Sequence, residues 1–164
     1  MSKKVLVVLL LVVVSMSLFG CKKLSNEEII ELTFEAAEGL NQKSDLGDYD
    51  LLAPIPYPMV IPDGGSMNGG DDRFDCFPYA GEAFITHFYL HSTTTNVYGI
   101  SNGQSADSID AVMKAEGFEK VADDADKVVY EKYDITVSFI LNEDKLVIEI
   151  RISVINSREA EKTY

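Results

Sequence analysis

The chain has 164 residues, of which 14 are basic and 27 acidic, for a formal net charge of −13. Such an acidic chain excludes nucleic acid as a partner, because the phosphates would be repelled. Its length suits one domain with a hydrophobic core and leaves little room for two. We interpret the acidity mainly as a source of solubility; a basic partner or cationic ligand is the alternative.

The N-terminus has the organisation of a bacterial export signal. Lys3 and Lys4 precede an unbroken apolar run, Val5 to Val14, and the whole apolar stretch is shorter than the roughly 20 residues of a membrane span. The stretch closes with Leu18-Phe19-Gly20-Cys21, which resembles the lipobox of bacterial lipoproteins. The resemblance implies that residues 1–20 are removed and that Cys21 is acylated. An ordinary secretory signal or an uncleaved anchor is the alternative.

A lipidated Cys21 predicts a protein held by membrane lipid on the extracytoplasmic side of a bacterial membrane. Two acyl chains hold a protein durably, whereas one binds only marginally. Residues 21–24 would form the tether, in which Lys22 and Lys23 meet the headgroups. Loss of residues 1–20 removes only two lysines and leaves a net charge of −15.

A single domain is expected over residues 25–158, followed by a tail at 159–164. Its first element is a helix from Ser25 to Leu40, because Ser25 and Glu28 have the spacing of a capping box. Gly39 and Asn41 are the expected stop signals. The apolar stripe of this helix requires a partner surface.

Residues 51–75 are expected to form a proline-rich strap and then an acidic, glycine-rich loop. Four of the five prolines lie between Pro54 and Pro62, and alternating proline forbids a helix and weakens a central strand. The loop from Asp63 to Asp72 contains four glycines and is expected to be flexible. It lacks the side-chain oxygens that a calcium loop needs at its third and fifth positions.

The remainder predicts strands around one further helix. Residues 83–91 and 96–100 have strand character, and Ser105 caps a helix that ends near Glu116, with Gly117 and Phe118 forming a Schellman ending. Residues 128–133, 135–141 and 146–154 alternate apolar and polar side chains, which is typical of a sheet with one dry and one wet face. The predicted fold is a two-layer α+β domain in which the helices cover one face of an antiparallel meander.

Residues 96–154 are similar to small envelope lipoproteins of the SmpA/OmlA type and to β-lactamase-inhibitor-protein-like domains. The similarity rests on the turn Gly99-Ile100-Ser101-Asn102-Gly103, the helix after it, Gly117-Phe118 and three strands. The resemblance implies a binding or assembly role in the cell envelope rather than catalysis, and no functional residue is carried over.

Enzymatic alternatives depend on a few residues. The turn at Ser101 matches a G-x-S-x-G nucleophile elbow, but no histidine follows His91 and no parallel sheet is predicted. His87 and His91 lie about 13 Å apart at strand spacing, which is too far to share one metal ion without bending. Cys76 is interpreted as a small buried hydrophobe, with a reactive thiol as the alternative.

We therefore predict a non-enzymatic lipoprotein, without catalytic residues, metal or cofactor, that binds a protein partner or scaffolds an assembly at the envelope. The expected contact surface is the wet face of the sheet together with the loop at 63–81. A hydrolase or metal-dependent enzyme using Ser101, Cys76, His87 or His91 is the first alternative, and an inhibitor of a secreted enzyme is the second. The candidate binding residues are Asp71, Asp72, Tyr79, His87, Tyr89 and His91.

Overall fold

The computed structural model describes residues 23–55 and 65–156. Within them the chain forms an antiparallel sheet with two α-helices, which confirms the α+β class. The elements are α2 (Asn26–Lys43), β1 (Gly65–Gly69), β2 (Asp72–Tyr79), β3 (Glu82–Leu90), the 3-10 turn η1 (Ala106–Ser108), α3 (Ile109–Ala115), β4 (Glu119–Asp123), β5 (Lys127–Lys132), β6 (Ile135–Leu141) and β7 (Val147–Val154). The predicted signal, Cys21 and the tail lie outside the described residues.

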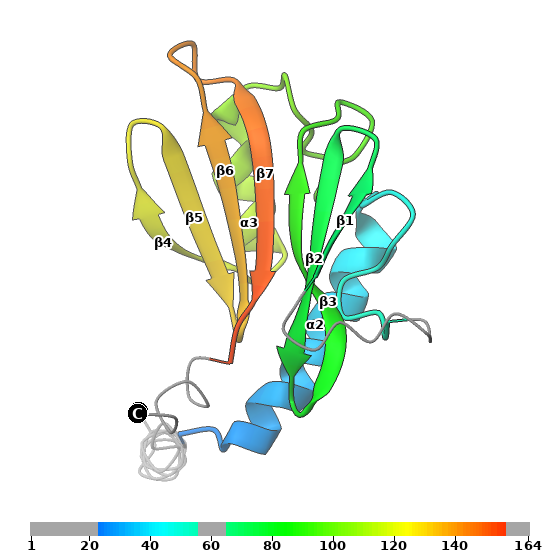
Figure 1. Cartoon of the computed structure of the whole chain (residues 1–164). Helices are drawn as coiled ribbons and strands as arrows, with labels where there is room; N and C mark the ends of the chain where they lie inside the picture. The colour runs from blue at the N-terminus through cyan, green and yellow to red at the C-terminus, as the bar shows by residue number, and fades with distance from the viewer. Residues whose placement is uncertain (1–22, 56–64, 157–164) are drawn as a thin grey trace, which may run out of the picture.

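The seven described strands pair in the order β1-β2-β3-β7-β6-β5-β4, and each pair is antiparallel (Figure 1). Sequential strands are neighbours within β1–β3 and within β4–β7. The two runs join where β3 pairs with β7, which follows it by more than fifty residues. The sheet as a whole is therefore not one continuous meander. No helix in the described ranges is long and apolar enough to cross a membrane.

Helix α2 begins where the sequence predicts. The Ser25 hydroxyl accepts the backbone N–H of Glu28 at 3.2 Å, and the Glu28 carboxylate accepts the backbone N–H of Ser25 at 2.8 Å. This reciprocal capping box satisfies two N–H groups that the helix leaves unpaired. The helix continues to Lys43, beyond the predicted end at Leu40. Asn41, an expected stop signal, lies within the helix, and its side chain bonds to the backbone of Leu51.

The second predicted helix is divided. The Ser105 hydroxyl accepts a backbone N–H two residues later and caps the 3-10 turn η1, from which α3 continues. At the other end, Gly117 has φ +81°, and the N–H of Phe118 donates to the carbonyl of Met113 at 3.0 Å. With the bond from Gly117 N–H to the Lys114 carbonyl, this forms the predicted Schellman ending.

The predicted flexible loop at 63–72 is partly wrong, because β1 and the start of β2 form a hairpin there. Their pairing runs from Gly65↔Cys76 to Gly69↔Asp72 and leaves Gly70 and Asp71 as the turn. Gly70 has φ +70°, which glycine adopts without strain. A glycine-rich strand has no apolar alternation, so period-two patterning does not detect it.

Two further expectations need correction. Residues 96–100 form a turn rather than a strand: Val97 and Ile100 exchange backbone hydrogen bonds, and Tyr98 and Gly99 between them have positive φ. β4 was not predicted, and it is short, mostly exposed and irregular in register between Lys120 and Ala122. Irregular, charged edge strands resist pairing with another chain.

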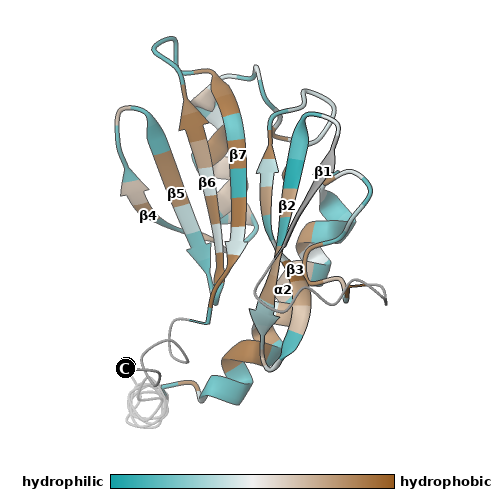
Figure 2. Ribbon diagram, viewed as in Figure 1, coloured by the Kyte–Doolittle hydropathy of each residue, from teal (hydrophilic) through white to brown (hydrophobic). Residues whose placement is uncertain are grey.

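The core lies on the predicted dry face of the sheet. One row of cross-strand neighbours runs through five strands, and each of its side chains is exposed by 2 % or less: Phe74, Phe88, Ile152, Val137 and Tyr130. A second row contains Leu90, Ile150 and Phe139, all fully buried. The alternation that predicted these strands is visible along β7 in Figure 2.

A register shift between Asp75 and Cys76 changes the faces within β3. Asp75 pairs with His87 and Cys76 with Ile85, so Thr86 is the extra residue of a β-bulge. Strict alternation predicts Ile85 on the wet face, but the structure buries it to 1 % exposure. The bulge is the physical reason, because one additional residue interrupts the period of two.

Both helices contribute to this core. The Phe34 ring of α2 lies 5.8 Å from the Tyr79 ring and 5.4 Å from the Phe84 ring, measured between centroids. From α3, Ile109 and Met113 are fully buried in the same cluster. Figure 1 shows α2 behind β2 and β3, and α3 behind β6 and β7.

Candidate functional site

Three side chains line up across the polar face of the sheet, from β2 through β3 to β7. In the pairing register Arg73 lies opposite Tyr89, and Tyr89 lies opposite Arg151. Both arginine side chains are about half exposed, at 51 % and 50 %, and the tyrosine is half-buried. We call these three residues the Arg-Tyr-Arg platform. Their strand neighbours Phe88 and Ile152 point into the core, so the platform lies on the opposite surface.

The first arginine of the platform is held in place from two sides. Its Nε and Nη2 atoms donate to the two carboxylate oxygens of Asp75 at 3.1 and 2.8 Å. Its guanidinium carbon also lies 5.0 Å from the centroid of the Tyr89 ring, within cation–π distance. The bond to Asp75 is the main cause of the raised pKa of Arg73. Bidentate pairing fixes the plane of the guanidinium group and leaves its other N–H groups free to bind.

The second arginine repeats the arrangement on β7. Arg151 donates through Nε and Nη2 to Glu149 at 2.9 and 2.8 Å. The His91 Nε2 atom lies 3.6 Å from the same carboxylate. Hydrogen bonding from Arg151 is the main cause of the lowered pKa of Glu149, with a smaller contribution from His91. Each platform arginine is thus held by an acidic residue two positions away on its own strand.

An aromatic pair borders the platform. The Phe77 ring is 39 % exposed, and its centroid lies 5.0 Å from that of the His87 imidazole in an edge-to-face arrangement. His87 pairs in register with Asp75, the same residue that holds Arg73. The platform and this pair thus place aromatic rings and guanidinium groups on neighbouring positions of β2 and β3. Such an arrangement suits recognition of another molecule by stacking and hydrogen bonding.

The structure gathers half of the predicted binding residues here. His87, Tyr89 and His91 all lie on the polar face, and Asp71 lies in the exposed hairpin turn beside Asp72. Arg73, Arg151 and Phe77 were not predicted. Arg73 and Arg151 each lie two residues from an acidic partner, a spacing that places both side chains on one face of a strand. This spacing can be found in the sequence, but the pairing of the strands that brings the two arginines beside Tyr89 cannot.

Tyr79 and Asp72 were expected at the binding surface, and the structure places both inside. Tyr79 is 2 % exposed, packs on Phe34, and donates its hydroxyl to Asp134 at 3.0 Å. The Asp72 carboxylate is 5 % exposed and accepts from the backbone N–H groups of His91 and Ser92 and from the Thr95 hydroxyl. Asp72 thus holds residues 91–95, which follow β3, in place through hydrogen bonds.

The structure shows the surroundings of the residues named in the enzymatic alternatives. Cys76 is a free thiol at 1 % exposure, which confirms it as a buried residue, and burial raises its pKa. Ser101 lies in a turn where its own backbone N–H donates to the Gln104 side chain. Across residues 23–55 and 65–156, no three His, Cys, Asp or Glu side chains are placed to hold a metal ion.

We expect the protein to lose stability as the pH falls through the ordinary histidine pKa of 6.5, and His87→Gln to reduce that loss. Burial lowers the pKa of His87 in the folded state, opposed in part by Asp75. The unfolded chain therefore binds this proton more readily. The contribution of the neutral imidazole is complete above pH 6.5 and is lost as the pH falls from there through the folded pKa.

Urea unfolding of the parent protein and the variant at about pH 7.5 and about pH 5.5 measures this difference. Titrating carboxylates affect both proteins alike, so only the difference between the two pH-dependent losses reports on His87. An equal loss in the two proteins would contradict the prediction.

The chain matches no protein-family model, no curated protein and no solved structure.

Proposed function

We propose that this protein is a non-enzymatic lipoprotein that binds a protein partner through the Arg-Tyr-Arg platform at the extracytoplasmic side of a bacterial membrane. The anchor in this proposal is an acylated Cys21, predicted from the lipobox at 18–21. The observation that carries the binding role is the ladder of Arg73, Tyr89 and Arg151 across three strands, in which both arginines are about half exposed and yet held by fixed partners.

Residue type supports a protein partner. Tyrosine and arginine are enriched among the few residues that supply most of the energy of protein interfaces. Arg73 and Arg151 are already ordered by Asp75 and Glu149, so a partner that binds them loses less side-chain entropy. Tyr89 provides a large surface with only two rotatable side-chain bonds.

The surroundings of the platform support the same role. Ser138 lies next to Arg151 in the register, and the following row contains His87, Ser153 and Thr136. Short hydroxyl side chains leave the bulkier platform accessible and can bond to a partner at the edge of the contact. A central group of aromatic and arginine residues within a polar rim is the usual organisation of a protein interface.

We further propose that the domain has two layers, with both helices on the face of the sheet opposite the platform. The contacts of Phe34 with Tyr79 and Phe84, and the burial of Ile109 and Met113 in the common core, support this arrangement. It would leave the platform face free of other elements. The resemblance of residues 96–154 to SmpA/OmlA-type envelope lipoproteins agrees with a binding or assembly role.

Affinity capture with the lipidated full-length protein in detergent-solubilised envelope tests the binding role. We expect Tyr89→Ala to weaken binding of the captured partner by about 30-fold or more, the effect of removing a residue central to an interface. Tyr133→Ala is the matched control, because Tyr133 is 43 % exposed in the turn between β5 and β6, away from the platform. Equal binding by the parent and Tyr89→Ala would reject the platform as the site.

The anchor is tested separately in the same cells. Cys21→Ser should shift the protein from the membrane fraction to the soluble fraction, or leave the precursor uncleaved. Unchanged processing and membrane retention would reject lipidation without affecting the result for Tyr89.

A further inference from the structure

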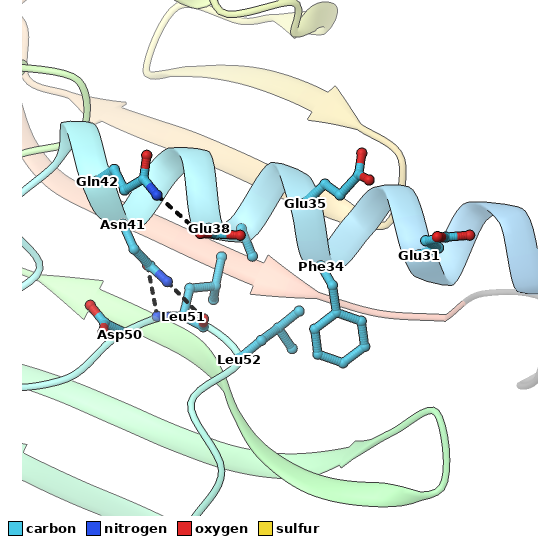
Figure 3. A pocket seen from close by; sticks show the side chains of 10 residues that line it. Glu31, Phe34, Glu35, Glu38, Asn41, Gln42, Asp50, Leu51 and Leu52 are labelled. Carbon is cyan, nitrogen blue, oxygen red and sulfur yellow. Dashed lines mark hydrogen bonds between the residues drawn. The ribbon is translucent and has the colours of Figure 1, made fainter.

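A groove of about 670 Å³ lies between helix α2 and the segment at 50–52, away from the Arg-Tyr-Arg platform. Its base is apolar and includes Phe34 and Leu52, whose side chains approach each other in Figure 3. Its rim carries four carboxylates, from Glu31, Glu35, Glu38 and Asp50. Among the described residues, no lysine or arginine lines it. We call this feature the acidic groove.

The helical repeat places these carboxylates together. Glu31, Glu35 and Glu38 follow one another at spacings of four and three residues, so their side chains lie along one side of α2. Phe34 lies beside this row and contributes its ring to the groove. Like charges at such spacings destabilise an isolated helix slightly. In this protein the capping box and the burial of Ala37 and Leu40 support the helix.

The opposite wall is held in a defined position. The Asn41 side chain donates to the carbonyl of Leu51 at 3.0 Å and accepts its N–H at 2.9 Å, which ties the segment to α2. The N–H of Leu52 donates to the carbonyl of Ile85 at 2.8 Å, which ties the same segment to β3. Both walls of the groove are therefore anchored, and a ligand would find the cavity already formed.

The four carboxylates of the rim have no cationic partner among the described residues. Some acidic side chains elsewhere in the described residues have cationic partners, as in Glu116 with Lys43 at 2.6 Å and Asp110 with Lys114 at 2.7 Å. Within residues 23–55 and 65–156, no lysine, arginine or histidine pairs with a carboxylate of the acidic groove. Glu38 accepts a hydrogen bond from the neutral amide of Gln42 at 3.1 Å. The unpaired negative charge is concentrated around an apolar base.

We infer that the acidic groove binds a segment of a partner protein in which lysine or arginine side chains flank an apolar side chain. The apolar side chain would cover Phe34 and Leu52, and the flanking cations would pair with the carboxylates of the rim. The volume suits several side chains of a peptide. A single metal ion does not fit this arrangement, because the glutamates are spread along α2 and are not placed to ligate one centre.

Fluorescence anisotropy of the full-length protein with a short labelled peptide of alternating lysine and leucine tests the inference. We expect saturable binding that weakens as salt is added, because exposed charge pairs are screened. The triple substitution Glu31→Gln, Glu35→Gln and Glu38→Gln should raise the dissociation constant by about tenfold, the product of three modest exposed pairs. A peptide with glutamate in place of lysine should not bind.

The matched control changes the same amount of charge elsewhere, through Glu119→Gln, Glu131→Gln and Asp144→Asn, three exposed carboxylates outside the groove. Its dissociation constant should remain within about twofold of the parent value. Equal weakening in the two triple variants would show attraction by net charge alone and overturn the inference, as would the absence of saturable binding. Tyr89→Ala should leave peptide binding unchanged, so this result is independent of the proposed role of the platform.

Discussion

Phe88→Ala should lower the free energy of unfolding by about 3–5 kcal/mol, the range measured when a buried aromatic ring is truncated. Phe88 is 0 % exposed at the centre of the core row, and its ring lies 4.9 Å from that of Phe74 in an edge-to-face contact. Its register partner on the other side is Ile152 of β7. The substitution therefore opens a cavity where the two runs of strands meet. Urea unfolding followed by circular dichroism gives the value.

Phe77→Ala is the matched control for Phe88→Ala. It removes the same ring from the neighbouring strand, but Phe77 is 39 % exposed on the polar side of the sheet. Its loss should cost about 1 kcal/mol or less, because little apolar surface is removed from contact. Similar costs for the two variants would mean that β3 does not pack between β2 and β7 as described.

Asp72→Ala should destabilise the protein by about 2–4 kcal/mol, although the residue lies at the end of a hairpin turn. Its carboxylate accepts the N–H groups of His91 and Ser92 at 2.7 and 2.9 Å and the Thr95 hydroxyl at 3.2 Å. Alanine leaves these donors without an acceptor in a site with 5 % exposure. Buried donors without partners account for the cost. Thermal and urea unfolding measure it.

Asp71→Ala separates this role from the effect of charge. Asp71 is the exposed neighbour in the hairpin turn, so the same change should alter stability by about 0.5 kcal/mol or less. Asp72→Asn should fall between the two, since an amide oxygen still accepts hydrogen bonds but carries no charge. If Asp71→Ala were as damaging as Asp72→Ala, the network around His91 and Thr95 would not be the cause.

Local chemistry could be predicted from the sequence where neighbours along the chain decide the structure. The capping box at Ser25 and the Schellman ending at Gly117 involve residues within a few positions of each other, and both are present. Strict alternation along 135–141 and 150–154 identified side chains that are buried, among them Val137 and Phe139, whereas Ile148, predicted on the dry face, is 49 % exposed beside the register shift at Ile140 and Leu141. One solvated face and one dry face impose that period directly.

Prediction failed where backbone geometry, rather than side-chain type, decides the structure. β1 consists of residues Gly65–Gly69, and its pairing to β2 depends on main-chain groups that every residue carries. The bulge at Thr86 buries Ile85, which alternation assigns to the wet face. Neither strand β1 nor the bulge can be recognised from the alternation of apolar and polar residues in the sequence.

The candidate sites also combine features that the sequence predicts with features that only the tertiary structure decides. The sequence by itself determined the composition of the surface, namely an acidic chain with tyrosines and histidines in its middle, and it predicted the lipobox at Cys21. Only the tertiary structure decided that Tyr79 and Asp72 lie inside while Arg73, Tyr89 and Arg151 form a row. For the row, the physical reason is the pairing of β3 with β7, which places Tyr89 opposite Arg151. A contact between strands so distant in the sequence depends on the packing of the whole core, which no local pattern contains.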